Sequence, residues 1–184
     1  MKTDINFNIL MSKCRDNNRV YQEVLYTKYY ATVYKICMRY ASNNSEGLDF
    51  MQEIFIKTFN KINTNTFKGD SYAEMGAWIS RVATNYCIDQ YRKFKRRKES
   101  KLLDIPYNNI INITDDMEEE VEFTTSDAIN AIHKLSPRYR TIFNMFVMEG
   151  FTHKEISDEL SISVGASKSS LHKAKSNLRN ILEK

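Results

Sequence analysis

The fold is decided by residues 152–163, which read Thr152-His-Lys-Glu-Ile-Ser-Asp-Glu-Leu-Ser-Ile-Ser163. Thr152 and Glu155 stand at the spacing of a capping box, in which each side chain accepts a hydrogen bond from the other residue's backbone N–H. The stretch from Leu160 to Ser163 makes a short turn, and Ser163 can cap a second helix over residues 164–182. Two short helices joined by a tight turn predict a helix-turn-helix, although ordinary helical hairpins share this plan.

The helix before this pair is marked at both of its ends. Ser136 is a suitable N-cap, Pro137 suits the first helical position, and Gly150 suits the position just after the last turn. Apolar residues lie between these marks. We therefore expect a small helical domain over residues 126–184.

The first hundred residues also follow a helical period, and Ser71 and Glu74 predict a further capping box. The three apolar stripes are Leu25, Tyr29, Val33, Ile36 and Tyr40; Leu48, Met51, Phe55, Phe59 and Ile62; and Met75, Trp78, Ile79, Val82 and Tyr86. We expect three or four helices in a domain over residues 1–100. Residues 101–125 lack a sustained period and are interpreted as a linker. The predicted fold class is all-α, with two small helical domains.

The composition excludes several other classes of protein. The chain has 184 residues, with 5 Gly, 2 Pro and 3 Cys. So few glycines and prolines disfavour a loop-rich β fold and a Gly-rich dinucleotide site. The unpaired spacing of Cys14, Cys37 and Cys87 disfavours disulfides and a zinc site. With neither a secretory segment nor a long apolar run, we expect a cytoplasmic protein without membrane insertion, metal or cofactor.

The formal net charge of +4 conceals an uneven distribution of charge. Residues 77–101 carry 8 basic and 2 acidic side chains, whereas residues 102–127 carry no basic and 8 acidic ones. Residues 128–184 are basic again, with 9 basic and 5 acidic side chains. Basic blocks attract phosphate backbones, so nucleic acid is a candidate partner, although a hydrated surface explains any single block equally well.

The last helix has small and basic side chains on the face that points away from its core. At 100° per residue the core side is Val164, Leu171, Ala174, Leu178 and Ile181, and the opposite side is Ala166, Ser169, Ser170, Lys173 and Ser176, with Lys168 and His172 on one flank. Small side chains permit entry into a major groove, and lysine can reach phosphates or guanine acceptors. A solvated helix in a bundle is the alternative.

A second candidate surface lies on the helix that ends in the basic run. Arg81, Asn85 and Arg92 share one stripe, and aromatic residues lie near them. Rings stack on bases, cations bind phosphates and an amide reads base edges, so this stripe suits single-stranded nucleic acid. Trp78 lies on the apolar stripe, which favours a core position for it over a stacking role.

A third surface lies on the helix over residues 49–57, where Phe50 and Ile56 stand among charged residues. Apolar side chains on a charged face suggest contact with a partner. Catalysis is disfavoured, since the three histidines lie in different elements and none stands in a nucleophile–base–carboxylate spacing.

Four motifs follow one another along the chain. Asp49-Phe-Met-Gln-Glu-Ile-Phe55 is similar to D-L-V-Q-E-x-F, and Phe67-Lys-Gly-Asp-Ser71 to F-[RK]-G-[DE]-S. Trp78-Ile-Ser-Arg-Val-Ala-Thr-Asn-Tyr-Cys-Ile-Asp-Gln-Tyr-Arg92 is similar to W-L-x-R-I-A-x-N-x-x-I-D-x-x-R, and parts of residues 135–174 are similar to region 4. Together they resemble bacterial RNA polymerase sigma factors of the sigma-70 family, extracytoplasmic-function (ECF) subfamily.

The resemblance implies a sigma factor that binds core RNA polymerase and directs promoter-specific initiation, with no catalytic residue. Its region 2-like domain would dock on the β′ clamp helices and hold the melted −10 strand, and its region 4-like domain would contact the β flap and read the −35 element. It further implies an anti-sigma partner and a bacterial cytoplasmic protein that joins the nucleoid when active. The implied docking residues are Asp49, Phe50, Gln52, Glu53 and Ile56; the −10 residues are Phe67, Lys68, Arg81, Asn85, Tyr86 and Arg92; the −35 residues are Lys168, Ser169, Ser170, His172 and Lys173.

Three features depart from the family pattern. Ser170 replaces an arginine, Ser167 replaces an apolar residue on the core stripe, and the stretch from residue 67 to 78 is about two residues longer than usual. The main rival interpretation is a stand-alone helix-turn-helix regulator that binds duplex DNA without polymerase. A helical adaptor without any nucleic-acid role is the second rival.

Overall fold

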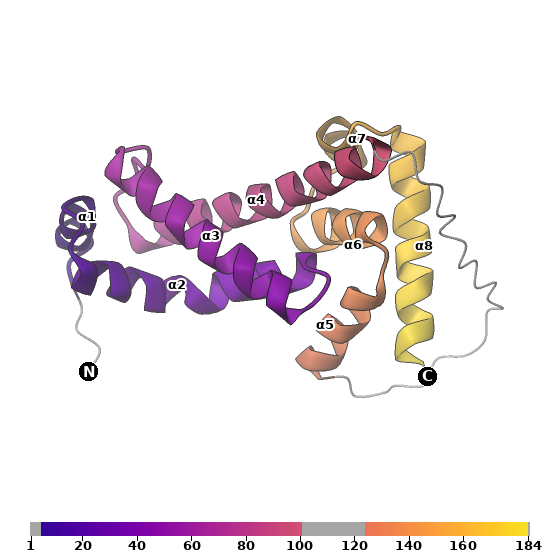
Figure 1. Ribbon diagram of the computed structural model, residues 1–184, viewed down its shortest axis with the longest axis horizontal. Coiled ribbons are helices and arrows are strands. Elements are labelled where there is room, and N and C mark those ends of the chain that lie inside the picture. Colours follow the sequence, from indigo (N-terminus) through magenta and orange to yellow (C-terminus); the bar gives the residue numbers. More distant parts are fainter. Residues whose placement is uncertain (1–4, 101–123, 184) are drawn as a thin grey trace. The chain divides into compact units, whose positions relative to one another are not determined.

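The computed structural model describes residues 5–100 and 124–183, and every regular element in these two ranges is helical (Figure 1). The all-α prediction is therefore confirmed. In chain order the elements are α1 (Phe7–Arg15), α2 (Arg19–Tyr40), α3 (Asn44–Asn63), α4 (Tyr72–Ser100), α5 (Thr125–Lys134), α6 (Pro137–Phe143), the π-helical turn η1 (Asn144–Met148), α7 (His153–Leu160) and α8 (Val164–Leu182).

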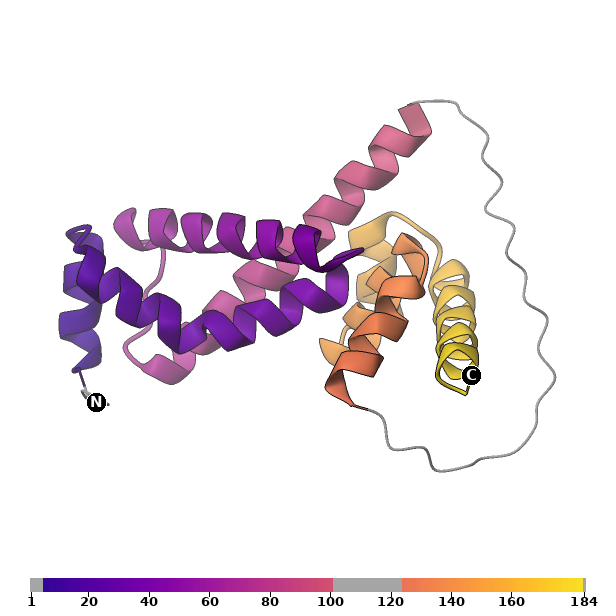
Figure 2. The same ribbon diagram turned by 60° about the horizontal axis from the view of Figure 1, so that its bottom comes forward.

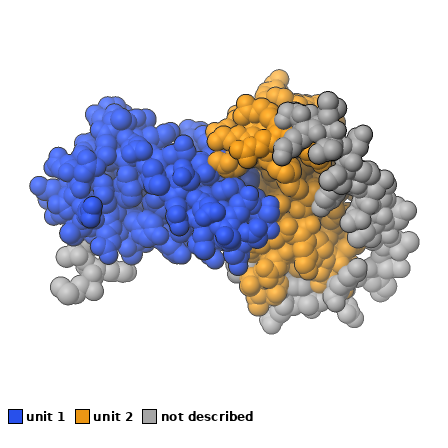
Figure 3. All heavy atoms as spheres, viewed as in Figure 1, with its two compact units in different colours: residues 1–87 blue, residues 88–184 orange. Residues whose placement is uncertain are grey.

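The chain divides into two compact units, residues 1–87 and 88–184 (Figure 3). The division falls inside α4, so the basic end of this long helix is grouped with the second unit. Nearly all of the predicted linker lies outside the described residues. Its last two residues belong to a helix start, because Thr124 and Asp127 form a reciprocal capping box.

In the first unit, α2 and α3 pack along each other (Figures 1 and 2). Leu25, Val33 and Ile54 are among its fully buried side chains. Gly47 permits the close approach of the two helices, because a Cβ there would lie 2.7 Å from Cε of Met38. Leu48 is expected on the buried stripe, and that placement is wrong, because its side chain is 40% exposed near the start of α3.

In the second unit, α8 packs against α5, α6 and α7. One core cluster joins α5 to α8 and consists of Ala131, Ile132, Leu135, Ala174 and Leu178. The helix-turn-helix has its own buried residues in Ile156, Leu160 and Leu171. Apolar burial on both sides of α8 therefore fixes how this helix is presented.

The predicted helix ends in the second unit are confirmed. Thr152 Oγ1 accepts a hydrogen bond from Glu155 N at 3.2 Å, and Thr152 N donates to Glu155 Oε2 at 2.7 Å. These hydrogen bonds from the Thr152 backbone and hydroxyl lower the pKa of Glu155. Gly150 has a φ of +75°, the left-handed conformation that glycine adopts most readily.

The start of α4 and the end of the helix that begins at Pro137 differ in detail from the sequence expectation. Ser71 Oγ accepts from Glu74 N at 3.4 Å, but the Glu74 carboxylate accepts from Asp70 N at 2.8 Å rather than from Ser71 N. The helix that begins at Pro137 widens into η1 before Gly150. Among residues 5–100 and 124–183, none of the helices combines the length and the apolar character needed to cross a bilayer.

Candidate nucleic-acid interfaces

The turn between α7 and α8 is held by hydrogen bonds on both of its sides. Ser157 Oγ donates to the Ile162 carbonyl at 2.6 Å, and Ser163 Oγ accepts from Ala166 N at 3.0 Å. Ser161 supplies the left-handed conformation at the end of α7, with a φ of 50°. A turn fixed in this way presents the start of α8 in one orientation, as a helix-turn-helix requires.

Four of the five predicted −35 residues lie on the exposed face of α8: Lys168, Ser169, His172 and Lys173. The predicted exposure of Ser170 is wrong, because its side chain is only 3% exposed and faces the packed side of the helix. Val164, which was expected in the core, is 41% exposed. The buried stripe of α8 therefore includes Ser167, as the sequence predicts, but takes in Ser170 instead of Val164.

On α4, Arg81 and Asn85 are both exposed and stand four residues apart, so their side chains share one face. Lys68, in the loop before α4, is exposed as well. A cation and an amide on one helical face can bind a phosphate and a base edge of the same strand. These three residues form the accessible part of the predicted −10 surface.

Phe67 occupies a different environment from these exposed residues. Its ring is 4% exposed and packs against Trp78, with ring centroids 5.1 Å apart, and against Phe7 of α1 at 6.2 Å. Trp78 is half-buried there, in line with the core position favoured from the sequence. In this conformation Phe67 is part of the packing beneath the loop and does not face a bound strand.

The start of α4 is anchored by α1, by Ile5 just before it and by α2, which the sequence did not reveal. The hydroxyl of Tyr72 donates to the Ile5 carbonyl at 2.7 Å, and the hydroxyl of Tyr29 donates to the Tyr72 carbonyl at 2.7 Å. The ring of Phe7 lies 5.1 Å from that of Tyr72. Phe7 and the aromatic residues near position 70 were the available signal, but pairing them requires knowledge of a contact over more than sixty residues.

Tyr86 lies beside the predicted docking surface. Its ring meets the edge of Phe50 at a centroid distance of 5.6 Å, and Lys57 Nζ lies 5.7 Å from the ring centroid. Burial raises the pKa of Tyr86 to about 12, and the nearby Glu53 carboxylate adds to the rise. Tyr86 therefore joins α4 to α3, a placement that its predicted role in strand binding did not suggest.

The predicted docking surface is accessible. Asp49, Gln52, Glu53 and Ile56 are exposed on α3, and Phe50 is half-buried. Ile56 is 54% exposed in spite of its apolar side chain. An apolar group surrounded by charged ones on a helix face is the composition of a protein contact surface.

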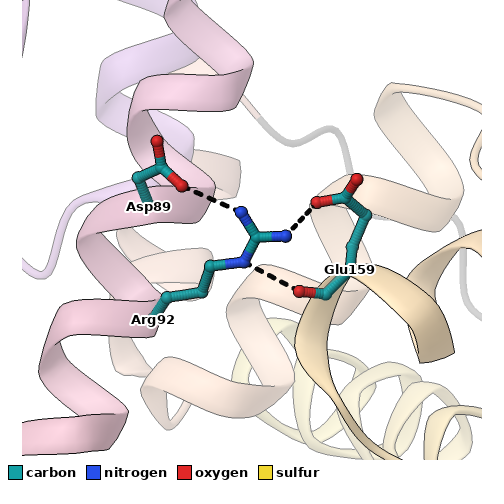
Figure 4. A network of polar contacts seen from close by, with 3 residues as sticks. All are labelled: Asp89, Arg92 and Glu159. Carbon is teal, nitrogen blue, oxygen red and sulfur yellow. Dashed lines mark hydrogen bonds and ion pairs between the residues drawn. The ribbon is translucent and has the colours of Figure 1, made fainter.

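Arg92, the last predicted −10 residue, is engaged within the second unit (Figure 4). Its Nη1 donates to Asp89 Oδ1 at 2.9 Å, its Nε donates to the Glu159 carbonyl at 2.8 Å, and its Nη2 pairs with the Glu159 carboxylate. Lys95 Nζ donates to the Leu160 carbonyl at 3.2 Å. The end of α4 thus contacts the end of α7 through its cations.

The fold is all-helical in the described residues and contains a helix-turn-helix, and its exposed helix faces have the composition of nucleic-acid and protein contact surfaces. Comparison of the sequence with protein families matches sigma-70 region 2 over residues 25–97 and sigma-70 region 4 over residues 127–178. Together the two matches cover more than half of the chain. The chain belongs to the sigma-70 family.

Two curated relatives and one solved structure are similar to the chain. The chain is 29% identical over 161 residues to the ECF RNA polymerase sigma factor SigW of Bacillus subtilis, and the aligned part covers 82% of each protein. It is 26% identical to the ECF RNA polymerase sigma factor SigE of Mycolicibacterium smegmatis over 158 residues, 83% of this chain and 58% of that protein. A similar solved structure is the sigma factor RpoE in complex with the anti-sigma factor NepR from Bartonella quintana, with 18% identity, 88% and 96% coverage, and a TM-score of 0.49.

Proposed function

We propose that this chain is an ECF sigma factor that binds core RNA polymerase and directs promoter-specific transcription initiation. The observation that carries the proposal is the occurrence of region 2 and region 4 matches in one chain, over residues 25–97 and 127–178. A stand-alone helix-turn-helix regulator would require a domain like region 4 but not a domain like region 2. The exposed partner surface on α3 supports the same choice.

The −10 step is assigned to Arg81 and Asn85 of α4, together with Lys68. Asn85 offers an amide to the edge of an unpaired base, and Arg81 offers a charge to the adjacent phosphate. Unstacking a base costs roughly a few kcal/mol, and capture of the unpaired base offsets this cost and thereby holds the strand open. This step requires neither ATP nor a catalytic residue, so we propose a binding protein without enzymatic activity.

The −35 step is assigned to the exposed residues of α8. Lys168 and Lys173 provide charges for phosphates or guanine acceptors, and Ser169 and His172 provide hydrogen-bonding groups between them. Ser170 stands where the family has an arginine, and its short side chain is buried. This helix therefore lacks a long cation that the family carries. We expect the −35 element of this protein to differ from the elements read by relatives that carry arginine there.

Docking is assigned to Asp49, Gln52, Glu53 and Ile56 of α3, with the β′ clamp helices as the partner, and the second unit is expected to meet the β flap. Membership of the ECF group further supports an anti-sigma factor as a regulatory partner. In this account the protein acts in the bacterial cytoplasm and associates with the nucleoid when it is active.

The experiment is run-off transcription from a library of random promoters, with purified core polymerase and this chain. The proposal predicts transcripts that require both proteins and that come from templates sharing two sequence elements. Asn85→Ala should lower the yield about tenfold or more, because it removes the amide that receives the base, whereas the matched Asn130→Ala on α5 should leave it unchanged. Absence of any core-dependent transcript contradicts the proposal and favours the regulator.

A further inference from the structure

A partly buried hydrogen bond joins the two helices of the helix-turn-helix. His153 Nδ1 lies 2.9 Å from Ser167 Oγ. His153 is the first residue of α7, and Ser167 is the fourth residue of α8, fourteen positions further along the chain. The side chain of Ser167 is 0% exposed and that of His153 is half-buried, so the contact reaches from the edge of the motif to its interior.

The position of His153 is itself fixed on two sides. Its ring stacks on that of Phe146, with centroids 4.5 Å apart and an interplanar angle of 25°. The backbone just before it is held by the capping box of Thr152 and Glu155. A ring that is stacked and anchored in this way has little freedom, so the atom it offers to Ser167 is presented at a defined place.

Ser167 stands on the core-facing stripe of α8, where the sequence pattern predicts an apolar residue. A buried hydroxyl costs free energy unless it is hydrogen-bonded, and His153 satisfies it. An apolar residue at this place would tolerate small shifts of the helix, whereas a hydrogen bond fixes both distance and direction. At position 167 this chain therefore has a directional hydrogen bond to His153 where an apolar residue would make a non-directional contact.

The part of α8 that is fixed is the part that carries the predicted −35 contacts. Lys168 and Ser169 follow Ser167 directly, and His172 lies little more than one turn further on. Binding groups must be held within about 0.5 Å of their productive positions, so a contact at Ser167 determines where these side chains reach.

We propose that His153 is a positioning residue for −35 recognition, acting through Ser167. This proposal rests on the proposed function of the chain as a sigma factor. His153 itself does not touch DNA in this account. It sets the rotation and depth of the first turns of α8, and thereby decides which bases Lys168 and Ser169 can contact.

The test uses holoenzyme with the full chain and the random-promoter library. His153→Phe keeps a ring to stack on Phe146 but has no atom to pair with Ser167, and Ser167→Ala removes the hydroxyl. Each variant should lower the preference for the selected −35 element about tenfold and leave the −10 preference unchanged. The double variant should lose no more than either single variant, because all three lose the same contact. His133→Phe on α5 is the matched control and should behave like the unaltered chain.

Three results would overturn the proposal. One is an unchanged −35 preference in both single variants, and another is an additive loss in the double variant. The third is an equal loss of −35 and −10 preference, which indicates a role in stability alone; thermal unfolding of the same variants then identifies that role. Should His153→Phe fail to fold, Ser167→Ala alone decides between these results. If the unaltered chain gives no core-dependent transcript, the proposed function fails, and this inference fails with it.

Discussion

Arg92 of α4 holds Glu159 of α7 through both its carboxylate and its backbone carbonyl (Figure 4). A guanidinium occupied in this way has fewer donors left for a DNA phosphate. The family resemblance implies that the same residue contacts the −10 strand, so Glu159 and that strand would compete for its guanidinium. Because the ion pair is partly exposed, its strength is modest and sensitive to salt.

We predict that Glu159→Gln strengthens binding of a fork-junction promoter fragment by the holoenzyme. The expected gain is about two- to threefold at low salt, since the pair is worth at most ~1 kcal/mol, and it should shrink as salt is added. Fluorescence anisotropy over a salt series measures it. Asp158→Asn removes an adjacent exposed carboxylate and serves as the control. Equal gains for both variants would show that general charge, rather than release of Arg92, is responsible.

Gly69 is predicted to tolerate no side chain. A Cβ there would meet the Phe67 ring and lie 2.6 Å from Glu74 Oε2, the carboxylate that caps the start of α4. Gly69→Ala should lower the free energy of unfolding by about 1–3 kcal/mol, as measured by urea denaturation. Gly165→Ala is the matched control, because the nearest atom to its Cβ is Ser163 Oγ at 3.9 Å. Its stability should be unchanged or raised by up to about 1 kcal/mol.

Tyr86 is predicted to make stability depend on pH in the alkaline range. Burial raises its pKa in the folded chain to about 12, whereas an unfolded tyrosine has a pKa near 10. The unfolded state therefore releases its proton first, and the free energy of unfolding falls as the pH rises from about 10 through 12. Denaturation at pH 9 and pH 11.5 should show a smaller fall for Tyr86→Phe than for the unaltered chain. An identical fall in both would contradict the raised pKa of Tyr86.

Lys168 is predicted to contribute an ionic contact to −35 binding. Lys168→Ala should weaken binding of holoenzyme to duplex promoter DNA and reduce the slope of log affinity against log salt by about 0.9, the value for one phosphate contact. Lys134→Ala on α5 is the control for removal of one exposed positive charge. An unchanged salt slope with lower affinity would instead indicate that Lys168 reads a base.

The sequence was most informative where structure is decided locally. The capping boxes and the helix-turn-helix depend on residues three or four positions apart, so Thr152 and Ser163 were recognised as helix starts. It was least informative where a residue's environment comes from far along the chain. Phe67 is buried because Phe7 and Trp78 cover it, and Tyr86 turns to α3 because Phe50 lies there.

The face of α8 was misassigned for a related reason. Serine and valine give a weak apolar pattern over its first turns, so an angular projection of the sequence could place Ser170 outward and Val164 inward. The packing of α8 against α5, α6 and α7 determines its true orientation, and these contacts come from other helices. A serine on an apolar stripe was the available signal, but it did not identify His153.

Permanganate probing of the −10 element tests the central claim most directly, because it detects unpaired thymines. On a promoter selected with the unaltered chain, core polymerase alone should leave these thymines protected, and core with this chain should make them reactive. Asn85→Ala should reduce that reactivity about tenfold while Asn130→Ala does not. Reactive thymines that appear without core polymerase, or none with it, would contradict the assignment of this chain as a sigma factor that stabilises the melted strand.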